Sequence, residues 1–173
     1  MRIEKTVTVN ASADRMWEIL GTEYLQSGRW ASAVYHSSGK GEPKIAGAPA
    51  AGRVCQTSLG PFTETIEAFD PVQRHVAYSA TGEKMPSFIK GLTNSWRVTP
   101  MGPSASKIEM ELTADIAFPF NILMGPMMKM QFGSVVKNVV GELKYYGETG
   151  KPHPRKVKVD GTKKARDARA AMA

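Results

Sequence analysis

The sequence predicts an α+β fold: a curved antiparallel sheet of about seven strands around one long C-terminal helix, with two short helices after the first strand. In residues 33–117, short segments of alternating apolar and polar side chains follow one another, separated by turn residues. From Asn121 to Tyr146, apolar residues instead recur every three or four positions, as in an amphipathic helix. Consecutive antiparallel strands curl strongly, so a helix that follows them buries its apolar side on their concave face.

The elements are expected in a simple order. The first strand spans residues 3–9, and "NASADRMWEIL" then predicts a helix, because Asn10 or Ser12 can cap it and its apolar residues share one side. A second short helix is expected to end near Trp30. The six further strands are predicted at residues 33–38, 53–59, 62–69, 74–80, 88–98 and 106–117.

The net charge of +7 is concentrated at the C-terminal end. Residues 151–173 hold eight Lys or Arg against two Asp, whereas residues 1–150 hold fifteen basic and fourteen acidic side chains. The body of the chain is therefore nearly neutral, which disfavours a nucleic-acid-binding face on it. We expect one domain at residues 1–150 and a basic tail at 151–173. The tail is compatible with a short helix near its end, but it has almost nothing apolar to bury, which favours a disordered, solubilising extension.

Composition disfavours several classes of protein. No apolar run approaches the ~18 residues that span a bilayer, and the start "MRIEKTVTV" lacks the apolar block of a secretory signal. The single cysteine, Cys55, excludes an internal disulfide and is typical of a reducing cytoplasm. The three histidines have no metal-ligand spacing, and no phosphate-binding glycine loop is present. We expect a cytoplasmic protein without metal or cofactor, and a homodimer is left open.

Four motifs occur in a fixed order: "VTVNASADRMWEIL" followed by Trp30, the hairpin "ETIEAFDP…HVAYSATG", "NSWRVTPMG", and "LKYYGETGKPHP". Over about residues 1–154, this order resembles the SRPBCC superfamily of START-like and Bet v 1-like proteins, and within it the polyketide cyclase/dehydrase group. The resemblance implies a helix-grip (Bet v 1-like) fold with a deep cavity between sheet and helix. It also implies binding or transfer of lipids, sterols, hormones or polyketides, with catalysis in some members. Gly21 stands where many relatives have an aspartate. The resemblance assigns no catalytic residue to this chain.

One carboxylate falls on the buried face of the predicted sheet. In the strand "GPFTETIEAFDP", Glu64 shares its face with Ile66 and Ala68. A turn at Gly60–Pro61 would place Arg53 opposite Ala68, diagonal to Glu64 or linked to it by water. An unpaired buried carboxylate costs several kcal/mol, so Glu64 requires a partner. It is a polar anchor for a ligand, or one half of a structural ion pair, or a residue turned to solvent by a bulge.

Other residues are expected around the same cavity. Trp30 and Tyr35 are placed near its mouth, and flexible methionines of the long helix suit a surface that adapts to ligands. Cys55 has no histidine nearby and is expected as a small buried side chain rather than a nucleophile. The candidate ligand-binding residues are Trp30, Tyr35, Cys55, Glu64, Ile66, Tyr78, Asn94, Trp96, Met110, Leu112, Met127, Gln131 and Val135. The candidates for catalysis are Glu64, Arg53 and Tyr78.

Three functions are compatible with this sequence. The first is binding or transfer of a small, mostly apolar molecule, such as a lipid or polyketide, in the cavity between sheet and long helix. The second is a cyclase or dehydratase-type enzyme that acts on a polyketide-like substrate in the same cavity, which requires an acid or base with a perturbed pKa. The third is weak docking of the basic tail, residues 151–173, on an anionic membrane or RNA.

Overall fold

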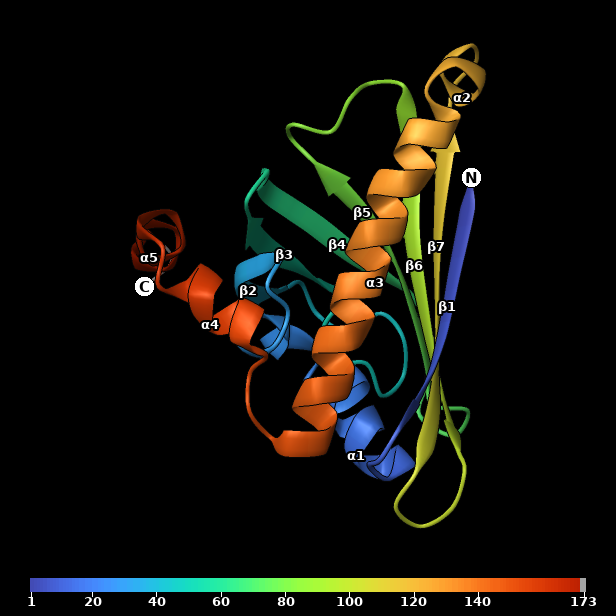
Figure 1. The fold of residues 1–173 in the computed structure, drawn as a ribbon, viewed down its shortest axis with the longest axis vertical. Coiled ribbons are helices and arrows are strands. Elements are labelled where there is room, and N and C mark those ends of the chain that lie inside the picture. Colours follow the sequence, from blue (N-terminus) through green and yellow to red (C-terminus); the bar gives the residue numbers. More distant parts are fainter. Residues whose placement is uncertain (172–173) are drawn as a thin grey trace.

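Seven antiparallel strands form one curved sheet in this computed structural model, which describes residues 1–171 (Figure 1). The long helix α3 crosses the concave face of the sheet, and the predicted helix-grip α+β fold is confirmed. The strands lie in the order β1-β7-β6-β5-β4-β3-β2. In chain order the elements are β1 (Arg2–Val9), α1 (Ala13–Trp17), η1 (Glu18–Thr22), η2 (Tyr24–Arg29), β2 (Val34–Lys40), β3 (Gly52–Thr57), β4 (Gly60–Asp70), β5 (His75–Gly82), β6 (Ile89–Pro100), β7 (Ser106–Ile116), α2 (Phe120–Leu123), α3 (Gly125–Thr149), α4 (Pro154–Asp160) and α5 (Lys163–Ala170).

The C-terminal helical region is divided into two helices near its start. The sequence predicts one helix from Asn121 to Tyr146, but the structure breaks it at Met124, between α2 and α3. Pro126 lies in the first turn of α3, where a missing N–H costs no helical hydrogen bond. Gly150 ends α3 with a φ of 69°, the left-handed conformation that glycine adopts readily. No helix of residues 1–171 is long and apolar enough to cross a membrane.

The core lies between the concave face of the sheet and one side of α3. In β7, every second residue from Ile108 to Ile116 is buried, as strand alternation predicts. The helix contributes buried side chains one or two turns apart, including Val136, Val140 and Leu143. Gly147 allows Met16 of α1 to pack against the end of α3, since a Cβ at Gly147 would overlap the Met16 side chain.

The β3–β4 hairpin differs from its predicted register. Its turn is Ser58–Leu59 rather than Gly60–Pro61, and Thr57 pairs with Gly60. Arg53 therefore lies directly opposite Glu64, not opposite Ala68. Gly60 is already the first residue of β4 and has a φ of 99°, which explains why a glycine stands there.

A bulge in β4 changes which residues face the core beyond Glu64. The pairing with β5 shifts between Ile66 and Ala68, which leaves Glu67 as the extra residue. Phe69 is buried as a result, whereas the sequence places Ala68 on the buried face. The bulge lies after Ile66, so Glu64 keeps its predicted inward orientation.

Candidate functional site

An internal cavity of about 160 Å³, here called the inner chamber, lies between α3, the helical segment of residues 13–29 and the inner face of the sheet. Its lining is mostly apolar, with the Arg53 and Glu64 side chains on one wall. Eight predicted ligand-binding residues line it, namely Trp30, Glu64, Tyr78, Asn94, Trp96, Met110, Leu112 and Val135. The structure therefore brings most of the predicted set to one place, and the role of these residues in ligand binding stays a prediction.

A second cavity of about 330 Å³, here called the outer chamber, adjoins the inner chamber at Val135, which lines both. It lies between the β5–β6 loop and the first turns of α3. Met127 and Gln131, predicted as ligand contacts, line this chamber and not the inner one. Lys84 is the charged side chain in its wall, and the rest is mainly Met, Phe, Leu and Ile. The two chambers together offer a polar inner end and an apolar outer end.

The polar group of the inner chamber is an ion pair across neighbouring strands. Arg53 of β3 donates from Nε to Glu64 Oε2 of β4 at 2.6 Å, and the two side chains are only 7% and 12% exposed. A second guanidinium nitrogen of Arg53 donates to the backbone carbonyl of Tyr24. The Tyr24 hydroxyl donates to the same Glu64 oxygen at 3.2 Å. The buried carboxylate thus has the partner that its burial requires, and the partner is Arg53.

Aromatic rings enclose this ion pair. The Arg53 guanidinium carbon lies 4.0 Å from the centre of the Tyr24 ring and 5.3 Å from that of Tyr78, distances at which a cation is attracted to a ring face. The Trp96 indole donates to the Tyr78 hydroxyl at 3.3 Å. Within residues 1–171, no protein group donates to the other carboxylate oxygen, Glu64 Oε1, and Glu64 lines the chamber. Glu64 Oε1 is therefore a hydrogen-bond acceptor without a protein donor in the described part of the chain.

Protonation in the chamber is set by burial. Burial raises the pKa of the Tyr24 and Tyr78 hydroxyls above the ordinary range. It also raises the pKa of the Cys55 thiol to about 12. Burial alone would lower the pKa of Arg53, but the adjacent Glu64 carboxylate keeps it above its usual value. At neutral pH the phenols can donate hydrogen bonds, and Cys55 is not a thiolate nucleophile.

Three predicted ligand-binding residues lie outside both chambers. Cys55 and Ile66 are buried in the core but line neither. Tyr35 is buried on the opposite side of β2, in a surface hollow that Arg169 also lines. Its position is a correction: Tyr35 is the extra residue where the β2–β3 register shifts between Val34 and His36, and it lies in this hollow instead of the chamber that Val34 lines. The main residue that the sequence reasoning missed is Tyr24, which reaches Glu64 from a short helix without strand periodicity.

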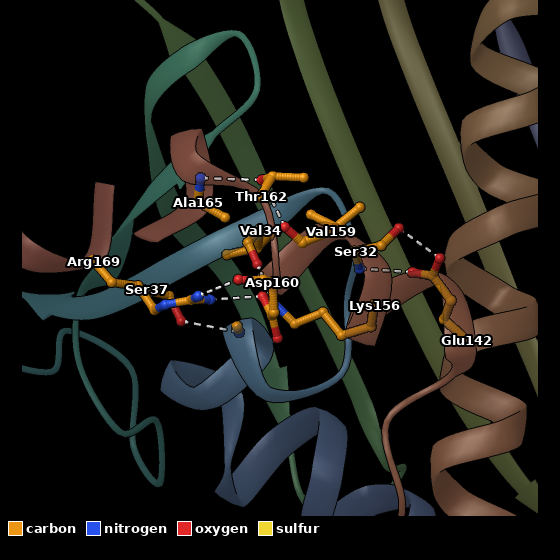
Figure 2. Close-up of polar contacts among 11 residues, drawn as sticks. Ser32, Val34, Ser37, Glu142, Lys156, Val159, Asp160, Thr162, Ala165 and Arg169 are labelled. Carbon is orange, nitrogen blue, oxygen red and sulfur yellow. Dashed lines mark hydrogen bonds and ion pairs between the residues drawn. The ribbon is translucent and has the colours of Figure 1, made fainter. Parts of the chain in front are cut away.

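Residues 154–170 form α4 and α5 and pack against the body, whereas the sequence predicts a disordered extension. Figure 2 shows Lys156 pointing inward from α4, where it is fully buried. Its Nζ donates to the Val34 carbonyl and to Asp160, both at 2.8 Å. Arg169 of α5 donates to the Asp160 carboxylate at 2.7 Å. Burial lowers the pKa of Lys156, and the neighbouring Asp160 carboxylate offsets this effect only in part.

A second buried carboxylate holds the segment before β2 in place. Glu142 of α3 is 1% exposed and accepts from the Ser32 backbone N–H at 2.8 Å and from its hydroxyl at 2.6 Å (Figure 2). Arg155 donates to the same carboxylate at 2.8 Å. The residues on either side of Ser32, and Val34, line the inner chamber. The C-terminal helices therefore fix one wall of that chamber through main-chain contacts.

Solved structures with the same fold are similar over most of this chain. A START superfamily protein from Mycobacterium smegmatis has a TM-score of 0.68 at 14% identity, covering 87% of this chain and 99% of that one. Norcoclaurine synthase from Thalictrum flavum, solved with dopamine and hydroxybenzaldehyde, has a TM-score of 0.60 at 14% identity, covering 86% and 88%. The di-domain ARO/CYC BexL from the BE-7585A biosynthetic pathway has a TM-score of 0.57 at 12% identity, covering 80% and 46%. At these identities the likeness shows the fold alone.

Sequence comparison identifies the family. A search of curated protein sequences finds no match. The family model described as "Polyketide cyclase / dehydrase and lipid transport" matches residues 1–148, which include the sheet, the Arg53–Glu64 pair and nearly all of α3. The chain therefore belongs to the polyketide cyclase/dehydrase and lipid transport family.

Proposed function

We propose that the protein binds a small, mostly apolar molecule that carries one hydrogen-bond donor, such as a hydroxyl group. The observation that carries this proposal is the Arg53–Glu64 pair on the wall of the otherwise apolar inner chamber. A donor on the ligand would bond to Glu64 Oε1, and the apolar remainder would extend past Val135 into the outer chamber. Few polar groups in a mainly apolar cavity are the usual means of orienting a small ligand.

The family and the fold support this proposal at a coarser level. The family description covers both lipid transport and polyketide cyclisation, and the fold is that of START-like proteins. The size of the chambers agrees, since ligand pockets usually have about 300–1,000 Å³ and the outer chamber alone has about 330 Å³. The inner chamber is smaller and suits one ring or a short chain.

Cyclase-type catalysis is the second candidate, and the tyrosines support it. Tyr24 and Tyr78 hold protonated hydroxyls beside the chamber and could stabilise a developing enolate by hydrogen bonding. Glu64 would be the base, but it would have to leave its bond to Arg53. Hydrogen–deuterium exchange at the acidic carbon of a phenyl-substituted diketone, followed by NMR, tests this candidate. Exchange that is faster with wild-type protein than with Glu64→Gln would favour it over binding alone.

Calorimetric titration with naphthol and with its methyl ether tests the binding proposal. The two compounds share their ring system, but only naphthol has a hydroxyl donor. We expect naphthol to bind more tightly to the wild type, by about the 0.5–1.5 kcal/mol of a net hydrogen bond. The preference should vanish in the double variant Arg53→Met/Glu64→Leu. Equal binding of both compounds to the wild type would contradict a donor-specific site.

A plug variant tests whether the chambers are the binding site. Val135 is half exposed and lines both chambers, so Val135→Trp should fill space in both without disturbing the core. The matched control is Val157→Trp, an equally large change on the exposed side of α4. Naphthol binding should be lost in the first variant and kept in the second. Retention of full affinity in Val135→Trp would place the binding site elsewhere.

A further inference from the structure

An exposed apolar surface lies at one end of the molecule, beside the outer chamber. We call it the apolar tip and define it by Phe118, Ile122, Leu123, Met127 and Met130, whose exposed fractions are 77%, 67%, 74%, 44% and 71%. These residues come from the loop between β7 and α2, from α2 and from the first turns of α3. In Figure 1, α2 projects beyond the sheet at the top of the view. Soluble proteins rarely gather large apolar side chains in one exposed patch unless it serves an interaction.

The structure orients α2 so that its apolar residues face outward. No residue of α2 is buried, so this helix adds nothing to the core. Its attachment is Phe120, whose ring stacks on Phe88 of the β5–β6 loop with 4.6 Å between ring centres. With Phe120 held in this way, Ile122 and Leu123 remain on the solvent side. Met127 continues the surface into the wall of the outer chamber.

The charge around the apolar tip is net positive, because Lys84, Lys129 and Lys137 outnumber the neighbouring acidic residues Glu83 and Asp115. Between Asp115 and Glu142 the sequence has no acidic residue, but it has Lys129 and Lys137. The β5–β6 region adds Lys84, which lines the outer chamber. These three lysines are exposed, and none forms an ion pair with another residue of 1–171. An apolar surface bordered by unpaired cations matches the interface of an anionic bilayer, where apolar side chains enter the acyl region and lysines meet the headgroups.

We propose that the apolar tip docks on an anionic lipid bilayer and thereby places the outer chamber at the membrane surface. A second copy of this chain fits the surface less well, because two identical tips, each with a net positive border, would repel each other. The basic tail is a weaker candidate for the same task, because Arg155, Lys156 and Arg169 are already bonded within the protein. Docking at this site would let a ligand pass from the membrane into the chambers. This inference therefore rests on the proposed function.

Vesicle flotation of the full-length protein tests the docking. The protein should float with vesicles of phosphatidylcholine and phosphatidylglycerol, and much less with phosphatidylcholine alone. Ile122→Ser/Leu123→Ser should lower the partition coefficient at least about tenfold, because both apolar side chains leave the bilayer. The matched control is Val72→Ser/Met101→Ser, which removes equally exposed apolar groups from turns at the other end of the sheet. This control should float like the wild type.

A second pair of variants separates the apolar tip from the basic tail. Lys84→Gln/Lys129→Gln should weaken flotation roughly fivefold for each lysine, the effect of one cation near an anionic surface. Lys158→Gln/Lys163→Gln removes the same charge from exposed positions of the tail and should have little effect. A larger loss of flotation in Lys158→Gln/Lys163→Gln than in Lys84→Gln/Lys129→Gln would overturn the proposal.

Three further results would also overturn it. The first is a wild type that fails to float with anionic vesicles, and the second is a tip variant that floats as well as the wild type. The third is a wild type that does not bind vesicles but forms a concentration-dependent dimer in sedimentation, which Ile122→Ser/Leu123→Ser abolishes. Naphthol binding is measured separately in the absence of lipid. A loss of docking with intact naphthol binding would thus refute this inference and leave the proposed function standing.

Discussion

Removal of the Glu64 carboxylate should destabilise the protein strongly, because Arg53 would be left as a buried, unpaired cation. The two side chains are 12% and 7% exposed, and the Arg53 Nε lies 2.6 Å from Glu64 Oε2. Breaking a buried ion pair from one side costs about 3–5 kcal/mol. We expect Glu64→Leu to lower the free energy of unfolding by about this amount, which corresponds to a fall in Tm of roughly 10 °C for a chain of this size.

Two further variants isolate the cause. Arg53→Met/Glu64→Leu removes both charges and puts apolar side chains in their place, so its stability should return to within ~1 kcal/mol of the wild type. Asp14→Asn breaks a surface ion pair with Arg74 that has the same 2.6 Å separation but an 85% exposed carboxylate. That change should cost less than ~1 kcal/mol. Because both ion pairs have the same separation, the difference in stability loss between Glu64→Leu and Asp14→Asn reports the effect of burying the charge.

Equilibrium urea titration, followed by tryptophan fluorescence, measures all three variants on one scale. The reasoning is refuted if Glu64→Leu costs no more than Asp14→Asn, since the pair would then behave as a solvated one. It is refuted equally if the double variant with Arg53→Met is as unstable as Glu64→Leu alone. In that case the loss of stability would come from altered packing and not from the buried, unpaired Arg53 cation.

Three other experiments test separate parts of the molecule. Because burial raises the pKa of Cys55 to about 12, its thiol should resist iodoacetamide in the folded protein at mildly alkaline pH and react in urea; rapid labelling of the folded protein, detected by mass spectrometry, would contradict this. Burial lowers the pKa of Lys156 in the folded state. At pH values between the folded and unfolded pKa of Lys156, the unfolded chain binds more protons than the folded protein. The stability of the wild type relative to Lys156→Met should therefore rise with pH. A stability difference that does not change with pH in urea titrations would contradict this. Gly21→Ala should cost about 1–3 kcal/mol because its Cβ would lie 2.5 Å from the Trp17 ring. The control Gly133→Ala meets no atom within 4 Å and should be neutral or stabilising by up to ~1 kcal/mol in the same titration.

The fold could be predicted because its signals are long and periodic. Strand alternation in residues 106–117 and helical spacing from Asn121 to Tyr146 each extend over many residues, so single errors do not change the assignment. The break at Met124 was harder to place, since Gly125 and Pro126 are compatible both with a kink and with the first turn of a new helix.

The composition of the chamber could also be predicted, but not its pairing. Alternation alone turns Tyr78, Asn94 and Met110 inward. The partner of Glu64 depends instead on where the preceding turn lies, and a turn displaced by two residues shifts the register by four, so that Arg53 faces Glu64 instead of Ala68. Local preference favours a turn at Gly60–Pro61, because glycine and proline are common turn residues, whereas the structure places the turn at Ser58–Leu59.

Contacts between distant segments were not accessible from the sequence. Tyr24 reaches Glu64 across 40 positions, from a short helix that has no periodic pattern of its own. The burial of Lys156 depends on the Val34 carbonyl, 122 positions away. The local signals that α4 does have are Pro154 in its first turn and the four-residue spacing of Lys156 and Asp160. They indicate a helix but not what it packs against.

A crystal structure of the wild-type protein with bound naphthol would show directly whether the ligand binds between the sheet and α3 beside Glu64. We expect electron density for a hydroxyl-bearing ring in the inner chamber, with its oxygen within hydrogen-bond distance of Glu64 and the second ring extending toward Val135. Density for naphthol on the outer surface only, with the chambers filled by the protein's own side chains, would contradict it.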